Sequence, residues 1–169
     1  LLVTAQRAKA DPLLVMLDGI TDPQNLGAII RSVDGAGAHG VIVPKRRAAG
    51  LTSAVAKSSS GALEFVPVAR VTNLVRTLKD LAAAGVWSLG VDPDGTNDFR
   101  EADYTLPVVI VVGSEGKGLS RVVKEACDAV TAIPMKGQLA SLNASVATGL
   151  VLYEASRQRE KKEPRRAKD

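Results

Sequence analysis

Cysteine and histidine are nearly absent from this sequence of 169 residues, with Cys127 and His39 the single residues of each type. One cysteine cannot form an internal disulfide, which fits a reducing cytoplasmic compartment. One histidine and one cysteine offer no cluster with metal-ligand spacing, so no zinc site is expected. We therefore predict a cytoplasmic protein without a bound metal, in which His39 is a structural residue.

Aromatic residues and long apolar runs are also scarce. Phe, Trp and Tyr make up 3% of the chain, which argues against the broad base stacking of single-strand-binding proteins. No run approaches the roughly 18 consecutive apolar residues of a membrane span. The opening segment Leu1–Leu14 carries Arg7, Lys9 and Asp11 where a signal peptide would be apolar. We expect no membrane association, and the missing initial Met suggests a preceding segment.

The net charge of +4 is concentrated at the C-terminal end. Residues 157–169 hold seven of the 22 basic and three of the 18 acidic side chains, so the rest of the chain carries 15 of each. We expect a solvated basic tail that does not order itself, with auxiliary phosphate contact as the alternative. A second basic cluster, Lys45–Arg47, follows an apolar triplet and should lie on a loop.

Short apolar runs alternate with segments of helical periodicity. The pattern predicts an α/β domain whose mostly parallel sheet is covered by helices on both faces. The predicted strands are Leu13–Leu17, Val41–Val43, Phe65–Val68, Val86–Val91, Val108–Val112 and Ala129–Ile133. Asp92–Asp98 should be a turn-rich surface loop. The last long helix, Ala144–Arg159, should have an apolar face made of Val146, Ala147, Leu150 and Val151.

Three segments that follow predicted strands are rich in Gly, Asn or Ser, and ligands bind at this edge of such sheets. In the first, Asp18–Arg31, the chain turns through Asp22-Pro23, and Asn25 is placed to cap the next helix. Arg31 lies further along that helix. It is either an exposed helix residue or a clamp for a phosphate or an oxyanion.

The second segment, Val111–Ser120, contains Gly113 and Glu115. A Walker A loop would need Gly where Val111 stands, and the dinucleotide fingerprint would need Gly where Arg121 stands. A nucleotide-binding oxidoreductase is therefore excluded, while a simple Gly-rich turn stays open.

The third segment, Ile133–Ala147, begins where Pro134 ends a strand, because proline cannot donate to the ladder. Ser141, Asn143 and Ser145 then surround the start of the last helix. Capping of that helix explains one of these small polar residues but not all of them.

Together the three segments resemble the motifs of the SpoU family of RNA 2'-O-ribose methyltransferases, in the SPOUT superfamily. Asn25-Leu-Gly-Ala-Ile-Ile-Arg31 is similar to the first motif, and Gly113-Ser-Glu-Gly-Lys-Gly-Leu119 is similar to the second. Ile133-Pro-Met135 followed by Ser141–Ala147 is similar to the third. The resemblance runs in order over Leu13–Arg159.

The resemblance implies a SPOUT fold with a deep trefoil knot in its C-terminal part, an exception to the rule that chains avoid threading. It implies S-adenosylmethionine as cofactor and a homodimer with the active site near the subunit boundary. Residues 1–159 would form the catalytic domain and 160–169 a basic tail. A smaller N-terminal RNA-binding domain usually precedes such a domain and is expected upstream of Leu1.

The resemblance also implies roles for individual residues. The predicted catalytic residues are Arg31, Asn25, Glu115, Asn143 and Ser141. The predicted cofactor-binding residues are Gly113, Ile133, Leu142, Met135, Leu89 and Gly90. Because arginine stays protonated across the ordinary pH range, Arg31 would stabilise developing charge more readily than it would remove a proton.

Asp22–Ala28 and Tyr153–Arg159 resemble the branch of the family that methylates a guanosine of 23S ribosomal RNA, so this is the expected substrate, with transfer RNA as the alternative. An rRNA methyltransferase that confers antibiotic resistance is a third possibility in the same class. A different class, an RNA-binding module without catalysis, would have no need to keep Asn25, Arg31, Glu115 and Asn143 together.

Overall fold

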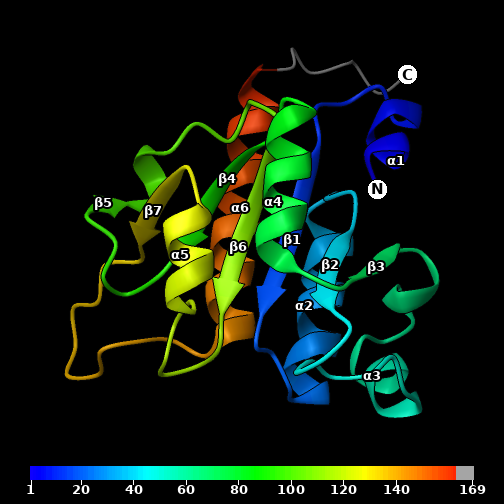
Figure 1. Ribbon diagram of the computed structural model, residues 1–169, viewed down its shortest axis with the longest axis horizontal. Helices are drawn as coiled ribbons and strands as arrows, with labels where there is room; N and C mark the ends of the chain where they lie inside the picture. Colours follow the sequence, from blue (N-terminus) through cyan, green and yellow to red (C-terminus); the bar gives the residue numbers. More distant parts are fainter. Residues whose placement is uncertain (163–169) are drawn as a thin grey trace.

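The computed structural model describes residues 1–162 and contains a seven-stranded sheet at its centre (Figure 1). Its strands are β1 Leu13–Asp18, β2 Val41–Pro44, β3 Val68–Val71, β4 Trp87–Val91, β5 Asn97–Asp98, β6 Val108–Gly113 and β7 Ala129–Ala132. The strand order is β3-β2-β1-β6-β4-β7-β5, and every pair is parallel. The carboxyl ends of the strands therefore meet at one edge of the sheet.

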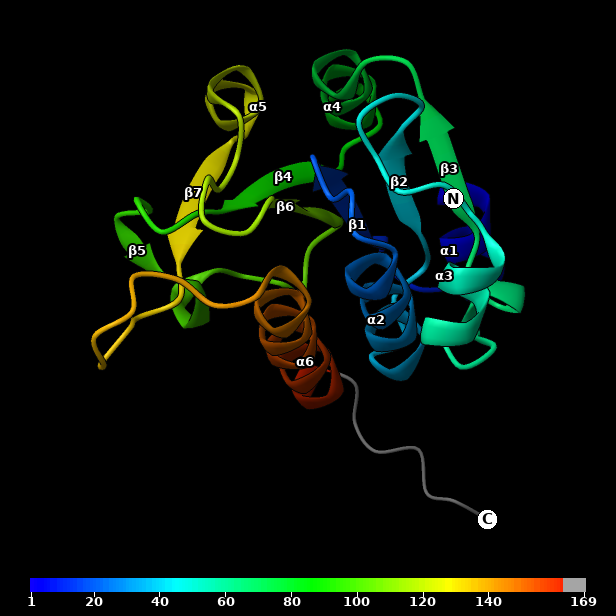
Figure 2. The same ribbon diagram turned by 90° about the horizontal axis from the view of Figure 1, so that it is seen from below.

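Helices cover both faces of this sheet, as the sequence predicts. The helices are α1 Leu2–Arg7, α2 Pro23–Gly35, α3 Ser53–Ser58, α4 Leu74–Ala83, α5 Arg121–Ala126 and α6 Ala144–Lys162, with short 3₁₀ turns at Ala62–Glu64 and Phe99–Glu101. Figure 2 shows α4 and α5 on one side of the sheet and α2 and α6 on the other. The α/β class is confirmed.

The two central strands explain why the sequence reads as uninterrupted apolar runs. β1 pairs with β6 along its whole length, and Leu13–Leu17 and Val108–Val112 are all buried. Leu13, Val15 and Leu17 belong to the core beneath α2 and α6, whereas Leu14 and Met16 belong to the core beneath α4. With a helical layer on each face, successive residues are equally apolar.

Two predictions about strands were wrong. Phe65–Val68 is not a strand: Phe65 follows a 3₁₀ turn and is 76% exposed, and β3 begins only at Val68. Pro67 has no N–H to donate to a ladder, which delays the strand, although its carbonyl accepts from Val41 N at 3.0 Å. Within the predicted surface loop 92–98, Asn97–Asp98 forms the short edge strand β5 beside β7.

Helix α2 begins earlier than the sequence predicts. Its cap is Asp22, whose Oδ1 accepts from Gln24 N at 2.9 Å, and Pro23 occupies the first turn. The fixed φ of proline suits this position, where the missing N–H costs nothing. Asn25 is therefore not the cap, and its side chain is available for other contacts.

Helix α6 departs from two predictions. It continues to Lys162, so residues 157–162 are ordered helix, while residues 163–169 of the predicted tail lie outside the described residues. The guanidinium of Arg159 donates to the carbonyls of Tyr104, Pro12 and Leu106 at 2.8 to 3.0 Å, which anchors this last part of the helix. The buried face of α6 consists of Ala144, Thr148, Val151, Leu152 and Ala155.

The predicted apolar face of α6 is thus divided between the core and the surface. Val151 is fully buried, but Val146 and Leu150 are 50% and 45% exposed. Tyr153 is also exposed, at 57%. Within residues 1–162 no helix has the length and hydropathy that a membrane crossing would require.

Candidate functional site

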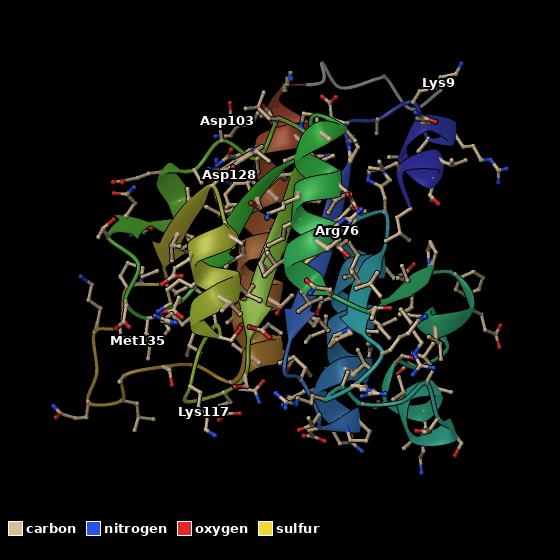
Figure 3. The ribbon with its side chains drawn as sticks, in the orientation of Figure 1. Lys9, Arg76, Asp103, Lys117, Asp128 and Met135 are labelled. Carbon is tan, nitrogen blue, oxygen red and sulfur yellow. The ribbon has the colours of Figure 1, made fainter. Side chains whose placement is uncertain are left out.

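A cavity lies at the carboxyl edge of the sheet, where β4, β6 and β7 end next to one another. Its space, open mouth included, is about 520 Å³. The walls come from the segments that follow these strands and from the first turn of α6. In Figure 3 the labelled Met135 marks the loop after β7, and Lys117 marks the loop after β6.

The loop after β6 is folded tightly on itself. Gly118 N donates to Ser114 O at 2.9 Å, and a Cβ on Gly113 would lie 2.1 Å from the carbonyl carbon of Gly118. No side chain fits at Gly113, so glycine is required there for the backbone to close. The base of the loop is held by carboxylates: Asp92 accepts from Leu119 N at 2.9 Å, and Asp18 accepts from Ser120 N at 2.7 Å.

Asp92 is the buried charge of the site, with 3% of its surface exposed. Its carboxylate also accepts from Lys124 Nζ at 2.8 Å and from Asp94 N at 3.0 Å. Burial opposes ionisation and is the largest single influence on the pKa of Asp92, but the Lys124 ammonium and the N–H donors together outweigh it and lower that pKa. Asp92 is therefore ionised and fixes the cavity wall.

A polar cluster stands beside the cavity, where α2, the loop after β6 and the start of α6 meet. The amide Nδ2 of Asn143 donates to Asn25 Oδ1 at 3.0 Å and to Glu115 Oε2 at 3.1 Å. The Oδ1 of Asn143 accepts from Ser145 N at 2.9 Å, so Asn143 is also the cap of α6. Because the nitrogen faces two acceptors and the oxygen faces a donor, only one of the two flipped orientations of the Asn143 amide satisfies these contacts. Residues from the three predicted segments thus meet in one network.

Most of the other predicted residues line the cavity itself. Those that do are Gly113, Glu115, Ile133, Met135, Ser141 and Leu142. Leu89 and Gly90 do not line it: Leu89 is buried in the core, and a Cβ on Gly90 would lie 2.8 Å from Leu119 Cδ1. These two residues pack β4 against its neighbours, and β4 reaches the cavity only at its last residue, Val91.

Arg31 lies apart from the polar cluster. Its Nη1 donates to Ser60 Oγ at 3.2 Å, on the side of α2 that faces α3. Asn25 and Arg31 are six positions apart, which places their side chains about 240° apart around the helix. Within one chain, the structure therefore brings together four of the five predicted catalytic residues, at the cavity or in the network beside it, but not Arg31.

The single histidine and the single cysteine take no part in the cavity. His39 Nδ1 accepts from Leu13 N at 3.0 Å; burial, together with the positive charge of Arg159, lowers the pKa of His39. Burial, with smaller contributions from Asp128 and Asp18, raises the pKa of Cys127 to about 12, so its thiol is un-ionised. Across residues 1–162 no three His, Cys, Asp or Glu side chains gather as a metal site would need.

The role of Asp92 was not predicted, because Asp-Pro-Asp-Gly has the composition of an exposed turn. The available signal was its position: it comes directly after the buried strand β4, as Asp18 comes at the end of β1. The cavity combines an apolar lining from Val91, Ile133, Leu142 and Ala144 with backbone groups of a tight glycine loop. Such a site suits a ligand with an apolar body and polar edges.

Comparison with known proteins places this chain in one family. The model of the SpoU rRNA Methylase family matches residues 12–153. An uncharacterized tRNA/rRNA methyltransferase of Mycobacterium sp. (strain KMS) is 57% identical over 159 residues, which cover 94% of this chain and 51% of that protein. A 23S rRNA (guanosine-2'-O-)-methyltransferase of Ralstonia nicotianae is 51% identical over 148 residues, covering 88% of this chain and 59% of that protein.

The fold is also that of solved methyltransferases. The SpoU methyltransferase AviRb from Streptomyces viridochromogenes, in complex with the cofactor AdoMet, superposes with a TM-score of 0.83. It is 39% identical and matches over 90% of this chain and 62% of that one. The chain belongs to the SpoU rRNA methylase family. It spans between half and two thirds of the length of the curated relatives named above.

Proposed function

We propose that this domain transfers a methyl group from S-adenosylmethionine to a ribose 2'-hydroxyl of RNA. The substrate we favour is a guanosine of 23S ribosomal RNA, as in the Ralstonia relative, with transfer RNA as the alternative. The observation that carries the proposal is the network of Asn25, Glu115 and Asn143 beside an apolar cavity with a tight glycine loop. A cytoplasmic location is part of the same proposal.

The cavity residues fit this cofactor. Leu142, Met135 and Ile133 would pack against the adenine and the methionine chain, and the backbone at Gly113 can approach a ligand because no Cβ intervenes. When bound, S-adenosylmethionine would supply an electrophilic methyl group: the ribose 2'-oxygen would bond to that carbon as the carbon–sulfur bond breaks, S-adenosylhomocysteine would leave, and the hydroxyl proton would pass to solvent. No metal is needed for this chemistry.

The polar network would orient the substrate. The carboxylate of Glu115 is exposed at the mouth, with Oε2 engaged by Asn143, so its remaining lone pairs are placed to accept from a ribose hydroxyl. Ser141 lines the same cavity. Holding the reacting atoms in line accounts for much of the rate enhancement of such a displacement. A guanidinium near the attacking oxygen would stabilise its developing charge.

We propose further that the active unit is a homodimer. Val146, Leu150 and Tyr153 are exposed apolar residues of α6 and line a shallow hollow with Ala28 and Ser32 of α2. Around α2, these two residues lie between Asn25 and Arg31. A two-fold dimer across the hollow would therefore bring Arg31 of one subunit towards the cavity of the other. This arrangement accounts for the separation of Arg31 from the other predicted catalytic residues.

The trefoil knot, a preceding RNA-binding domain and the basic tail belong to the proposal through the family resemblance.

A direct test combines binding and transfer. Calorimetry should show S-adenosylmethionine binding that is unchanged by a chelator. Labelled methyl groups should then enter unmodified rRNA or tRNA transcripts, and nucleoside analysis should find 2'-O-methylguanosine. Failure to bind the cofactor would refute the proposal. Cofactor and RNA binding without transfer would indicate the non-catalytic RNA-binding module.

A further inference from the structure

A second hollow lies on the other side of the loop after β6. It is an open groove of about 1260 Å³, mouth included, between that loop and the loop after β2. Arg46 and Arg47 line it from one side and Lys117 from the other. The floor includes Thr72 and Asn73 at the start of α4. Figure 3 labels Lys117 in the lower part of the view, below α5.

Both loops are held in place by backbone contacts. Lys45 N donates to Val71 O at 2.8 Å, and Arg70 Nη2 donates to Lys45 O at 3.3 Å, so β3 fixes the start of the loop after β2. Arg47 adopts a left-handed backbone with φ of 57°. The opposite loop is anchored through Ser120 N to Asp18. The cations thus project from defined positions.

The charges of this groove are not neutralised within the described chain. Neighbouring cations have carboxylate partners: Arg76 with Asp80, Arg121 with Glu125 and Lys124 with Asp92. By contrast, residues 1–162 offer no ion-pair partner within 4.0 Å to Arg46, Arg47 or Lys117. One carboxylate also lines the groove, that of Asp18, which accepts from Ser120 N, so the cations outnumber it three to one. The positive end of the α4 dipole faces the same space.

The groove shares a wall with the cavity. Ser114 and Gly118 line both spaces, so one thickness of backbone separates them. Among residues 1–162, no aromatic side chain lines the groove. A nucleic acid lying there would be held through its phosphates, not through stacked bases.

We propose that this groove binds the sugar–phosphate backbone of the substrate RNA beside the methylated nucleotide, with Arg46, Arg47 and Lys117 contacting phosphates. The inference rests on the proposed function, because the groove derives its role from the adjoining site. Cations on two facing loops match a strand that carries repeated charges better than they match a single small anion. Binding of this kind is independent of base identity and weakens steeply with salt.

The test removes the three charges with little change in shape. Arg46→Gln and Lys117→Gln keep long polar side chains, and Arg47→Asn suits the left-handed backbone. The probe is a fluorescently labelled single-stranded RNA of mixed sequence, followed by anisotropy over a salt series. The triple variant should bind about tenfold more weakly at low salt. A plot of the logarithm of its association constant against the logarithm of the salt concentration should have a slope that is shallower by about 2.

The matched control is the double variant Arg7→Gln, Lys79→Gln. Both side chains are exposed and lie outside the groove and the cavity. The control should bind RNA as the unmodified chain does, with the same salt slope. If the triple variant also bound like the unmodified chain, or if its slope were unchanged, the proposal would be wrong. If the triple variant did not fold, Lys117→Gln alone, on an exposed loop, should still reduce the slope by about 0.7.

Two readouts separate this proposal from the proposed function. S-adenosylmethionine affinity should be the same in the triple variant and the unmodified chain, because none of the three cations lines the cavity. In methyl transfer, the KM for RNA should rise while kcat at saturating RNA changes little. A chain that binds RNA through these residues but transfers no methyl group would refute only the function. Normal methyl transfer with unchanged RNA affinity in the triple variant would refute only the proposal that the groove binds RNA.

Discussion

Asn143 Nδ2 donates to Asn25 Oδ1 at 3.0 Å, and this contact joins positions 118 residues apart. The same amide holds Glu115, while its oxygen caps α6. One side chain thus links three segments and fixes the start of the helix. Its capping role and its donor role can be separated by substitution.

Asn143→Asp should keep the fold but abolish most methyl transfer. Aspartate caps helices as well as asparagine does, and Glu115 is exposed to solvent that screens the added charge, so the free energy of unfolding should fall by less than it does in Asn143→Ala. It cannot donate to Asn25, and it places a second carboxylate next to Glu115. Thermal unfolding and methyl-transfer assays on the same preparation measure the two effects.

Asn143→Ala is the matched comparison. It removes the cap as well as the donor, and should lower the free energy of unfolding by about 1 kcal/mol. Equal stability of the alanine and aspartate variants would contradict the capping role. Full activity of the aspartate variant would contradict the role of the amide donor.

The buried carboxylate of Asp92 should matter far more than that of Asp94, although both contact Lys124. Asp92→Ala leaves Leu119 N and Lys124 without their acceptor, and should cost about 2–4 kcal/mol of stability and weaken cofactor binding. Asp94 has an 86% exposed side chain, so Asp94→Ala should cost less than about 0.5 kcal/mol. Denaturant unfolding of both variants tests this difference, and equal losses would disprove it.

The sequence predicted most of the sheet because its central strands are buried on both faces. Leu13–Leu17 and Val108–Val112 are buried and apolar without alternation, and runs of five such residues are typical of strands covered on both faces. Phe65–Val68 is also a short apolar run, but it contains Pro67 and follows a 3₁₀ turn, so the strand begins only at Val68. The division of the α6 face between core and surface could not be predicted, because an apolar side chain does not reveal which neighbour, if any, covers it: Val151 is buried, whereas Val146 and Leu150 are exposed.

The site residues were predictable where polar side chains follow the strands at the spacing of a known motif. Asn25, Glu115 and Asn143 stand in polar segments after strands, and parallel strands bring such segments to one edge. Leu89 and Gly90 precede the end of β4, so they pack inside the sheet instead of lining the cavity. Asp92 was missed because its burial depends on Lys124 and Leu119, which are distant in sequence.

Stability should fall as the pH drops below about 6.5, because of His39. Its pKa is lowered in the folded protein from the model-peptide value of 6.5, so the unfolded chain takes up a proton first. Below 6.5 the unfolded state binds more protons, and the free energy of unfolding decreases by up to about 1.4 kcal/mol per pH unit until the folded pKa is reached. Urea unfolding between pH 5.5 and 7.5 measures this slope.

His39→Asn provides the control for that prediction. The Oδ1 of asparagine can accept from Leu13 N as Nδ1 of His39 does, but it does not titrate. The variant should therefore show a nearly flat dependence over the same pH window, since this is the only histidine of the chain. A slope in the variant as steep as in the parent would assign the effect to other groups.

Arg31→Ala should remove most methyl transfer while leaving S-adenosylmethionine affinity nearly unchanged. Arg31 does not line the cavity, so cofactor contacts remain intact. Losing one donor to a developing oxyanion costs on the order of 10²–10³ in rate. Arg31→Lys keeps the charge but loses the planar fork, and should recover little activity. Near-normal turnover by the alanine variant would make Arg31 an ordinary exposed residue of α2.

Mixing two inactive variants tests whether Arg31 acts across the dimer. Asn25 and Arg31 leave α2 on different sides, and the network on Asn143 excludes Arg31 within one chain. If Arg31 serves the partner's cavity, a heterodimer of Arg31→Ala with Asn143→Asp contains one intact site, assembled from the unaltered residue of each subunit. Random exchange of equal amounts makes half of the dimers mixed, so activity should return to about a quarter of the parent value. If both residues served the cavity of their own subunit, each subunit would carry a defect and mixing would restore nothing.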